Sequence, residues 1–241
     1  MGVVPMEARY SVIKEKDPRE IVLLRGIGCG WRKCRFCDYH LDFCKDPNEN
    51  FLLNRQVLTH VTGCYGKLEV INSGSFPELD PGSFFTLEQV CKEKQIRQLY
   101  FESHWRYREM IPLLKSRLSS LGITVKLKIG VETFNVSYRE KILRKGMGEC
   151  TPKEIASFFQ QVCLLQGLAG QSESSMIQDI EIGLQYFERV CVNLMNSNTT
   201  AIAPDPTVVK IFINNLLPVY QKNPRVDILL HNTDFGVGAG T

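Results

Sequence analysis

A long hydrophobic run is absent from this sequence of 241 residues. The longest apolar stretches, such as IVLL at 21–24, are far shorter than the roughly 20 residues that a membrane-spanning helix needs. The pattern of a signal peptide is absent too, because residues 1–20 carry charged side chains of both signs. We therefore expect a cytoplasmic protein with no membrane partner.

A strong imbalance of charge is also absent. The 29 Lys and Arg residues stand against 26 Asp and Glu residues, which gives a formal net charge of +3. A nucleic-acid polymer is usually bound by a strongly basic surface, so this balance argues against such a partner. No internal repeat, low-complexity tract or second domain is apparent, and residues 1–241 are predicted to form a single domain.

Short runs rich in Val, Ile and Leu alternate with segments of helical periodicity, which predicts an α/β fold with parallel strands and six βα units. The predicted strands lie near 21–27, 67–72, 97–102, 124–131, 161–168 and 190–196. The predicted helices lie at 85–95, 108–121, 137–146, 151–160, 173–188 and 207–222. Residues 40–60 lack periodicity and are predicted to be a long loop, and the tail FGVGAGT is expected to fray or to pack loosely.

The nine cysteines are an odd number for a secreted disulfide framework. Cys29, Cys34 and Cys37 form a C-x4-C-x2-C motif directly after a predicted strand. Such a short loop brings three thiolates onto one face of an iron–sulfur cluster and leaves one iron free for a further ligand. The alternative is a structural zinc site that Cys44 or His40 completes. The remaining cysteines are predicted to be packing thiols rather than ligands, namely Cys44, Cys64, Cys91, Cys150, Cys163 and Cys191.

This motif resembles the cluster loop of the radical S-adenosylmethionine (SAM) superfamily, in which an aromatic residue precedes the last cysteine, as Phe36 does here. The usual spacing is C-x3-C-x2-C, so the chain resembles variant members with one more residue. The resemblance implies a [4Fe-4S] cluster, SAM as its ligand and a (β/α)6 partial TIM barrel over residues 1–241, with a cluster loop at 28–45. An electron donor of the flavodoxin or ferredoxin type is then expected.

The resemblance continues along the chain. The segment NSGS at 72–75 is similar to the one whose backbone receives the SAM amino group. Glu102 in YFESHWRY resembles a position in relatives of the Elongator catalytic subunit, and ILRKGM offers Arg144 or Lys145 for the SAM carboxylate. Asparagines near 193–198 suit either ligand contacts or turns. The candidates for SAM binding are Phe36, Asn72, Ser73, Gly74, Ser75, Glu102, Glu132, Arg144, Leu168 and Asn193.

No region suited to RNA or peptide recognition is apparent, so a small substrate is expected. Among small radical SAM enzymes the chain resembles the queuine lyases of bacterial queuosine salvage, which would release queuine from queuosine 5'-phosphate. A basic loop containing Lys33 and Arg35 suits a phosphate or an acidic electron donor, although a solvated loop is equally consistent. The candidates for substrate binding are Arg25, Arg32, Trp105, Asp205 and Asp234, with Glu132 as a further carboxylate for the base. The alternatives are a 7-deazaguanine synthase, a tRNA-modifying relative of the Elongator catalytic subunit, and a zinc-binding interaction module.

Overall fold

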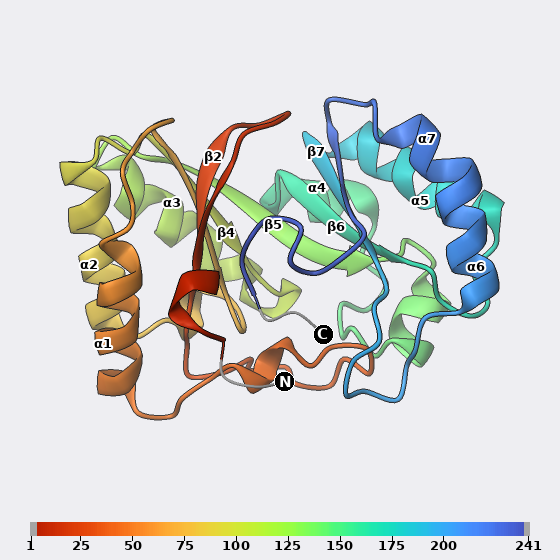
Figure 1. Ribbon diagram of the computed structural model, residues 1–241, viewed down its shortest axis with the longest axis horizontal. Coiled ribbons are helices and arrows are strands. Elements are labelled where there is room, and N and C mark those ends of the chain that lie inside the picture. Colours follow the sequence, from red (N-terminus) through yellow and green to blue (C-terminus); the bar gives the residue numbers. More distant parts are fainter. Residues whose placement is uncertain (1–3, 239–241) are drawn as a thin grey trace. The chain divides into compact units, whose positions relative to one another are not determined.

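The computed structural model describes residues 4–238 and is a mixed α/β structure (Figure 1). Residues 239–241, the end of the predicted glycine-rich tail, lie outside the described part. The strands belong to an eight-stranded sheet whose order follows the sequence from β1 to β8. They are β1 (Tyr10–Ile13), β2 (Arg19–Leu24), β3 (Lys67–Asn72), β4 (Gln98–Glu102), β5 (Thr124–Glu132), β6 (Gln161–Gln166), β7 (Arg189–Leu194) and β8 (Val226–Leu229).

The helices alternate with the strands, as the sequence predicts. They are α1 (Pro47–Leu58), α2 (Pro81–Glu93), α3 (Ile111–Ser119), α4 (Pro152–Phe158), α5 (Glu173–Tyr186), α6 (Pro206–Ile211) and α7 (Leu217–Tyr220). A π-helical turn at Phe212–Leu216 joins α6 to α7. The helix predicted at 137–146 is present but shorter than expected, and its main part is a π-helical turn at Tyr138–Ile142.

All six predicted strands are present as β2 to β7, with shifts of a few residues at their ends. Five strand pairs, β2–β3, β3–β4, β5–β6, β6–β7 and β7–β8, are parallel, which confirms the α/β prediction. The apolar run at 226–230 contains β8. β1, a short strand that pairs antiparallel with β2, was not predicted.

Residues 40–60 do not form a loop, because α1 begins at Pro47 within them. The Asp46 side chain caps this helix by accepting a hydrogen bond from the Asn48 N–H at 2.8 Å. The face that α1 buries carries Asn50 and Asn54 as well as apolar residues. Hydrophobic periodicity is therefore weak, and this is why the helix was missed.

Asn54 is fully buried and supplies partners to the chain that leaves β2. Its Oδ1 atom accepts the Arg25 N–H at 2.7 Å, and its Nδ2 atom donates to the Arg25 carbonyl at 2.8 Å. The same Nδ2 donates to the Ser83 hydroxyl on α2 at 2.9 Å. A single buried amide thus joins β2, α1 and α2.

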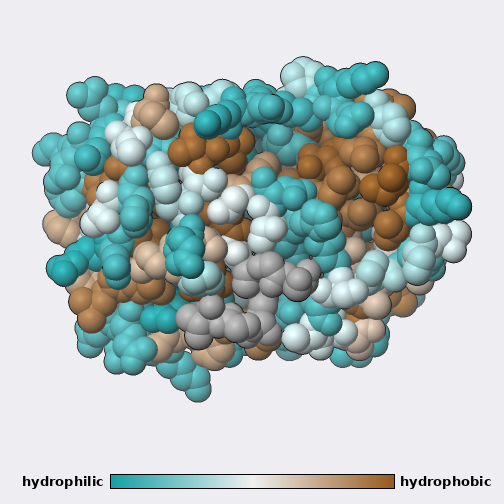
Figure 2. All heavy atoms as spheres, viewed as in Figure 1, coloured by the Kyte–Doolittle hydropathy of each residue, from teal (hydrophilic) through white to brown (hydrophobic). Residues whose placement is uncertain are grey.

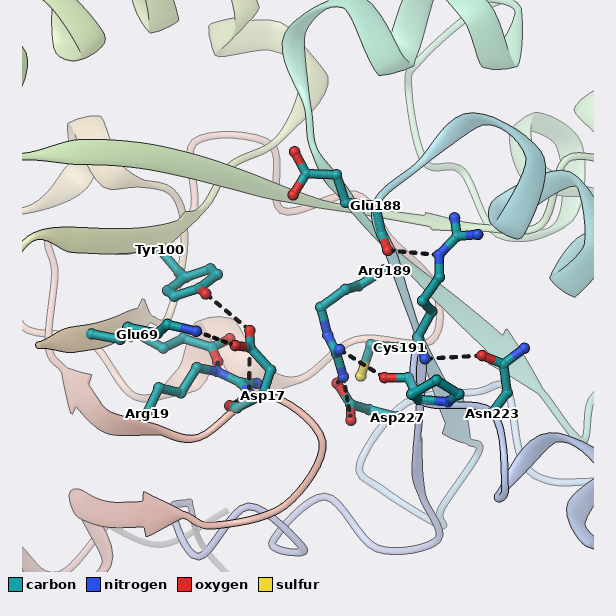
Figure 3. A network of polar contacts seen from close by, with 12 residues as sticks. Asp17, Arg19, Glu69, Tyr100, Glu188, Arg189, Cys191, Asn223 and Asp227 are labelled. Carbon is teal, nitrogen blue, oxygen red and sulfur yellow. Dashed lines mark hydrogen bonds and ion pairs between the residues drawn. The ribbon is translucent and has the colours of Figure 1, made fainter. Parts of the chain in front are cut away.

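The structure consists of two compact units, and the first comprises residues 4–32, 39–127 and 235–238. In this unit α1 packs against α2 and β2. Its buried ion pair joins Arg19 and Glu69, whose Nε and Oε2 atoms lie 2.5 Å apart (Figure 3). Asp17 accepts hydrogen bonds from Lys67 at 2.7 Å and Tyr100 at 2.9 Å. Burial alone would raise the pKa of Asp17, but these hydrogen bonds outweigh it and hold the pKa below its ordinary value.

The second unit comprises residues 33–38 and 128–234. Here α5 packs on β6 and β7 through a face of Met176, Asp179, Ile180 and Gly183, which recur at helical spacing. A Cβ atom at Gly183 would lie 2.8 Å from Val190, so glycine permits the close approach of helix and strand. In β7 and β8, Arg189 Nη2 contacts both carboxylate oxygens of Asp227 at 2.9 Å (Figure 3).

No helix within residues 4–238 is both long enough and apolar enough to cross a membrane. Among the most exposed large hydrophobic residues, Leu52, Phe85, Leu113 and Val219 come from four different helices. On the face drawn in Figure 2, hydrophobic atoms lie in patches that polar atoms separate. Single exposed apolar side chains of this kind are normal at protein surfaces.

We expect Asn54→Ala to lower the free energy of unfolding by about 2–3 kcal/mol, because it removes a fully buried amide and leaves the part-buried N–H and carbonyl of Arg25 without these partners. Urea unfolding followed by circular dichroism measures this change. Asn48→Ala, on the exposed side of the same helix, is the control and should change stability by less than about 0.5 kcal/mol. Equal effects of the two substitutions would contradict this role of Asn54.

Candidate functional site

Side chains at the carboxyl ends of parallel strands are the ones placed to bind ligands in α/β folds. In the first unit, Asn72 ends β3 and Glu102 ends β4. In the second unit, Glu132 ends β5 and Leu168 follows β6. Asn193 precedes the last residue of β7. The predicted positions of these candidates at strand ends are confirmed, while their roles in binding stay predictions.

Glu78, which was not among the predicted site residues, holds the loop that carries Cys29. It ends the 3₁₀ turn Phe76–Glu78 and is 4% exposed. Its carbonyl oxygen accepts the Ile27 N–H at 3.0 Å, and its carboxylate oxygen Oε1 accepts the Gly30 N–H. Hydrogen bonds from one residue therefore fix the backbone on both sides of Cys29.

The Glu78 carboxylate has two further donors. Oε2 accepts the Ser75 N–H, and Oε1 accepts the Tyr107 hydroxyl at 2.7 Å. Burial and the hydrogen bond to Glu78 raise the pKa of Tyr107 to about 12, so the hydroxyl remains a donor at neutral pH. Ser75 and Glu78 form a capping box. The S-x-x-E pattern of that box is the signal in the sequence that would have found Glu78.

Gly74 lies directly against Cys29. A Cβ atom at Gly74 would collide with the Glu78 carboxylate and would lie 3.2 Å from the Cα atom of Cys29. The absence of a side chain therefore lets the predicted SAM-binding segment approach the backbone of the first cysteine.

The neighbours of Gly74 are buried as well. The Ser73 hydroxyl donates to the Asp42 carbonyl, and the Ser75 hydroxyl accepts the His104 N–H at 2.9 Å. Asn72 donates from Nδ2 to the Ser75 carbonyl at 3.1 Å, whereas its Oδ1 atom has no hydrogen-bond partner within residues 4–238. Buried acceptors are nearly always paired, so this oxygen fits a ligand that donates a hydrogen bond.

Cys34 and Cys37 belong to the second unit, where hydrogen bonds hold the short segment around them. The Arg35 N–H donates to the Leu143 carbonyl at 3.0 Å. The Asn198 side chain donates to the Phe36 carbonyl at 2.7 Å.

Asp38, next to Cys37, was not predicted and is 3% exposed. Its carboxylate accepts the N–H of Thr199 at 3.2 Å and the hydroxyl of the same residue at 3.1 Å. The sequence offers no signal for this contact, because the two residues are far apart along the chain.

Lys145 lies beside this segment and forms an ion pair with Glu132, at 2.7 Å between Nζ and Oε1. The two side chains are 12% and 8% exposed. Nζ also lies 5.5 Å from the centre of the Phe36 ring. Burial lowers the pKa of Lys145, but the charges of Glu132, Cys34 and Cys37 outweigh burial and raise it. The stabilisation from protonated Lys145 is therefore complete at neutral pH and is lost only as pH rises beyond the ordinary lysine range.

The conformation of Glu132 is unusual, with a φ of 69° at a β-bulge. A Cβ atom at Gly130 would collide with the Glu132 carboxylate, so the chain folds tightly around this acid. A strained backbone at a strand end is a feature of functional sites. Of the two cations that the sequence offers here, Lys145 contacts Glu132, while Arg144 is exposed with a φ of 55°.

Comparison with models of protein families gives no match, and comparison with curated proteins gives none either. Among solved structures, a queuine lyase from Clostridium spiroforme bound to SAM and queuine matches this chain with a TM-score of 0.92 and 40% sequence identity. The match covers 97% of this chain and 100% of that chain.

The chain belongs to the queuine lyase family. Queuine lyases are radical SAM enzymes, so the family resemblance seen in the cysteine motif is confirmed. The match extends over essentially the whole chain, which means that both units belong to the family fold.

Two arginines, Arg25 and Arg32, were predicted to bind the substrate. Both contact other residues of the chain. Arg25 donates to Asn50 at 2.8 Å and to the Glu49 carbonyl at 3.2 Å, so α1 holds its guanidinium. Arg32 is exposed, and its guanidinium carbon lies 4.4 Å from the centre of the Phe43 ring. Arg32 is therefore the better placed of the two to meet a soluble anion.

Both aspartates predicted to read the base are used by the backbone. Asp205 caps α6 by accepting the Thr207 N–H at 2.9 Å. Asp234 accepts the N–H groups of Leu230 at 2.7 Å and His231 at 2.9 Å. Asp205 therefore acts as a helix cap and Asp234 stabilises a turn, while their role in binding the base stays a prediction.

A stacked aromatic pair is present beside the Cys29 loop, but it does not use Trp105. His104 stacks on Trp31, with ring centres 5.4 Å apart and an angle of 16° between the planes. Trp105 is half-buried, and the Arg108 guanidinium carbon lies 4.8 Å from the centre of its ring. The stacked pair at this loop is therefore Trp31 and His104, and the role of Trp105 in substrate binding stays a prediction.

Asn196 and Asn198, after β7, make backbone contacts of the kind expected for the turn interpretation, while ligand binding by Asn193 stays a prediction. Asn196 donates to the carbonyls of Leu194 at 3.1 Å and Leu230 at 2.9 Å. Asn198 accepts the Thr200 N–H at 2.9 Å in addition to binding the Phe36 carbonyl.

The other cysteines only partly match the prediction of packing thiols. Cys91, Cys163 and Cys191 are buried as expected, but Cys64 is exposed, so the prediction is wrong for it. Cys44 is half-buried, and its thiol donates to the Glu49 carboxylate at 3.2 Å. Within residues 4–238 no group of three His, Cys, Asp or Glu side chains is arranged as a metal site.

We expect Lys145→Met to lower the free energy of unfolding by about 3–5 kcal/mol, because it leaves the Glu132 carboxylate buried without its cation. Glu132→Gln should cost a similar amount, and the double variant should cost less than the sum of the two. Urea unfolding at neutral pH measures all three variants.

The control for this pair is Glu109→Gln, because the Glu109 side chain is 73% exposed in its ion pair with Arg108. That substitution should cost less than about 1 kcal/mol. Additive losses in the Lys145 and Glu132 cycle would show that the two groups act independently, contrary to their geometry.

Proposed function

We propose that this chain is a radical SAM lyase that holds a [4Fe-4S] cluster on Cys29, Cys34 and Cys37 and releases queuine from queuosine 5'-phosphate. The observation that carries the proposal is the full-length match, at 40% identity, to a queuine lyase bound to SAM and queuine. The order of strands and helices fits the partial TIM barrel expected for the superfamily. A cytoplasmic location, in which thiols stay reduced, suits the three ligands.

The chemistry of the donors fits the cluster. Three thiols fall within nine residues of chain, from 29 to 37, and the spacing leaves one iron open. When bound, the reduced cluster supplies the electron that cleaves SAM to methionine and a 5'-deoxyadenosyl radical. The residues of the chain position the reactants and exclude water.

Residues of the first unit suit the methionine part of SAM. The unpaired Oδ1 atom of Asn72 is an acceptor for the SAM amino group, and the bare backbone of Gly74 permits its close approach. In the second unit, Lys145 is a cation for the SAM carboxylate, although it shares its charge with Glu132. Leu168 is fully buried in a cluster with Leu143 that suits the adenine face.

The proposed substrate carries a phosphate, and the exposed basic residues of the cysteine loop suit such a small anion. Arg32, Lys33 and Arg35 are exposed and offer positive charge to a 5'-phosphate. Arg25 is committed to α1 and is not needed for this contact. The same basic loop suits an acidic electron donor such as flavodoxin.

We expect Cys29→Ala, Cys34→Ala and Cys37→Ala each to reduce SAM cleavage to background, because each removes a cluster ligand. Iron and sulfide analysis after anaerobic reconstitution, with 5'-deoxyadenosine measured by mass spectrometry, tests this. Cys44→Ala and Cys64→Ala are matched controls and should keep the iron content of the parent. A parent protein that binds one zinc ion, contains no sulfide and never forms 5'-deoxyadenosine would refute the proposal.

We expect queuosine 5'-phosphate to be turned over with about ten- to hundredfold higher kcat/KM than queuosine, because charge-assisted hydrogen bonds to the phosphate contribute to binding. Queuine release under reducing, anaerobic conditions measures both substrates. Equal activity on the two compounds would overturn the phosphate contact. Robust SAM cleavage with another substrate alone would overturn the queuine assignment and leave the radical SAM chemistry intact.

A further inference from the structure

The Glu78 carboxylate is a buried charge that is not among the groups expected to touch SAM or substrate. Its donors come from three separate segments: the Cys29 loop, the turn after β3 and the 3₁₀ turn Trp105–Met110. Burying an ionised group is costly unless it is well paired. The free-energy cost of burying the Glu78 carboxylate beside the Cys29 loop suggests that the carboxylate has a role in positioning this loop.

We propose that Glu78 is a positioning residue that fixes the Cys29 loop against the Gly74 turn, so that the first cysteine is preorganised for the cluster. The inference rests on the proposed function, because it assigns Cys29 to the cluster. Glu78 itself acts through the backbone and does not touch the ligand.

The geometry around Cys29 supports this role. The backbone carbonyl and the carboxylate of Glu78 accept the N–H groups of Ile27 and Gly30, which lie on opposite sides of Cys29 in the chain. The second carboxylate oxygen accepts the N–H of Ser75, the residue after Gly74. One side chain thus binds the backbones of both segments at the point where Gly74 meets Cys29.

The Gly30 peptide is held from its other end as well. The Arg106 guanidinium donates to the Gly30 carbonyl, and the Tyr107 hydroxyl shares the carboxylate oxygen that the Gly30 N–H uses. A Cβ atom at Gly30 would collide with the Tyr107 hydroxyl and would lie 2.8 Å from Glu78 Oε1. In this position the N–H and the carbonyl of Gly30 both have partners, and no side chain would fit at residue 30.

A carboxylate is required here and an amide is not equivalent. Glu78 accepts hydrogen bonds on both oxygens, from the N–H of Ser75 on one and from Gly30 and Tyr107 on the other. A glutamine has one accepting oxygen, and its NH2 group would face a backbone N–H. Glu78→Gln keeps the size of the side chain and removes one of the two anchoring points.

The test is amide hydrogen exchange of the reconstituted enzyme and of its Glu78→Gln variant, read by mass spectrometry on the peptide covering residues 26–32. We expect at least about tenfold faster exchange of this peptide in the variant, because the charge-assisted hydrogen bond to the Gly30 N–H is replaced at best by one to a neutral amide oxygen. We also expect a lower iron content per chain after identical reconstitution. Tyr107→Phe, which removes one donor and keeps the carboxylate, should give a smaller change in the same direction.

Glu88→Gln is the matched control, because Glu88 is a buried carboxylate on α2 whose partner is Arg117. It should leave exchange at residues 26–32 and iron content unchanged. Parent-like exchange and iron content in Glu78→Gln would overturn the inference, and so would equal losses in Glu88→Gln. If Glu78→Gln does not fold, Tyr107→Phe decides: unchanged exchange in that variant counts against the role.

The outcome for Glu78 is separable from that of the proposed function. Exchange at residues 26–32 is measured without turnover, whereas the function is judged on the parent enzyme by formation of 5'-deoxyadenosine and queuine. If Glu78→Gln speeds exchange of the loop but the parent enzyme never cleaves SAM, the anchoring role of Glu78 stands and the radical chemistry is refuted. Full queuine release by Glu78→Gln with unchanged iron would do the reverse.

Discussion

The chain that leaves β2 must find hydrogen-bond partners for a backbone that no longer pairs in the sheet. A buried N–H or carbonyl without a partner costs as much as a lost hydrogen bond, so the elements around it have to supply them. Asn54 does so at Arg25, and Glu78 does so at Ile27 and Gly30. α1 and the turn after β3 each supply a buried polar side chain, Asn54 and Glu78, to this stretch of chain.

The same requirement explains where the sequence was informative and where it was not. Hydrophobic runs predicted β2 to β7 because parallel strands are buried on both faces. The hydrophobic pattern could not predict α1, because Asn50 and Asn54 occupy positions on the buried face of this helix that apolar residues usually hold. The helix predicted at 137–146 is mainly a π-helical turn, a distinction that a residue pattern does not contain.

The candidate site was predictable to a similar extent. The cysteine motif, together with resembling segments along the rest of the chain, indicated the radical SAM superfamily, and strand ends indicated Asn72, Glu102 and Glu132. Residue type was a poor guide to the roles of single charged residues, because an aspartate such as Asp205 is as suitable for a helix cap as for a ligand. Glu78 carried a local signal in its capping box, whereas the contact of Asp38 with Thr199 is set by tertiary structure alone.

The contact of Gly74 with Cys29 also limits how this scaffold can be altered. Because even a methyl group at Gly74 would meet the Glu78 carboxylate and the Cys29 backbone, the turn after β3 offers no room for new side chains. The loop 195–204 after β7 is held instead at Asn198 and Thr199, which bind the Phe36 carbonyl and the Asp38 carboxylate. Redesign of the substrate range should therefore begin at the loops after the later strands. The first two βα connections, which carry the cysteine motif and the Gly74 turn, should be left unchanged.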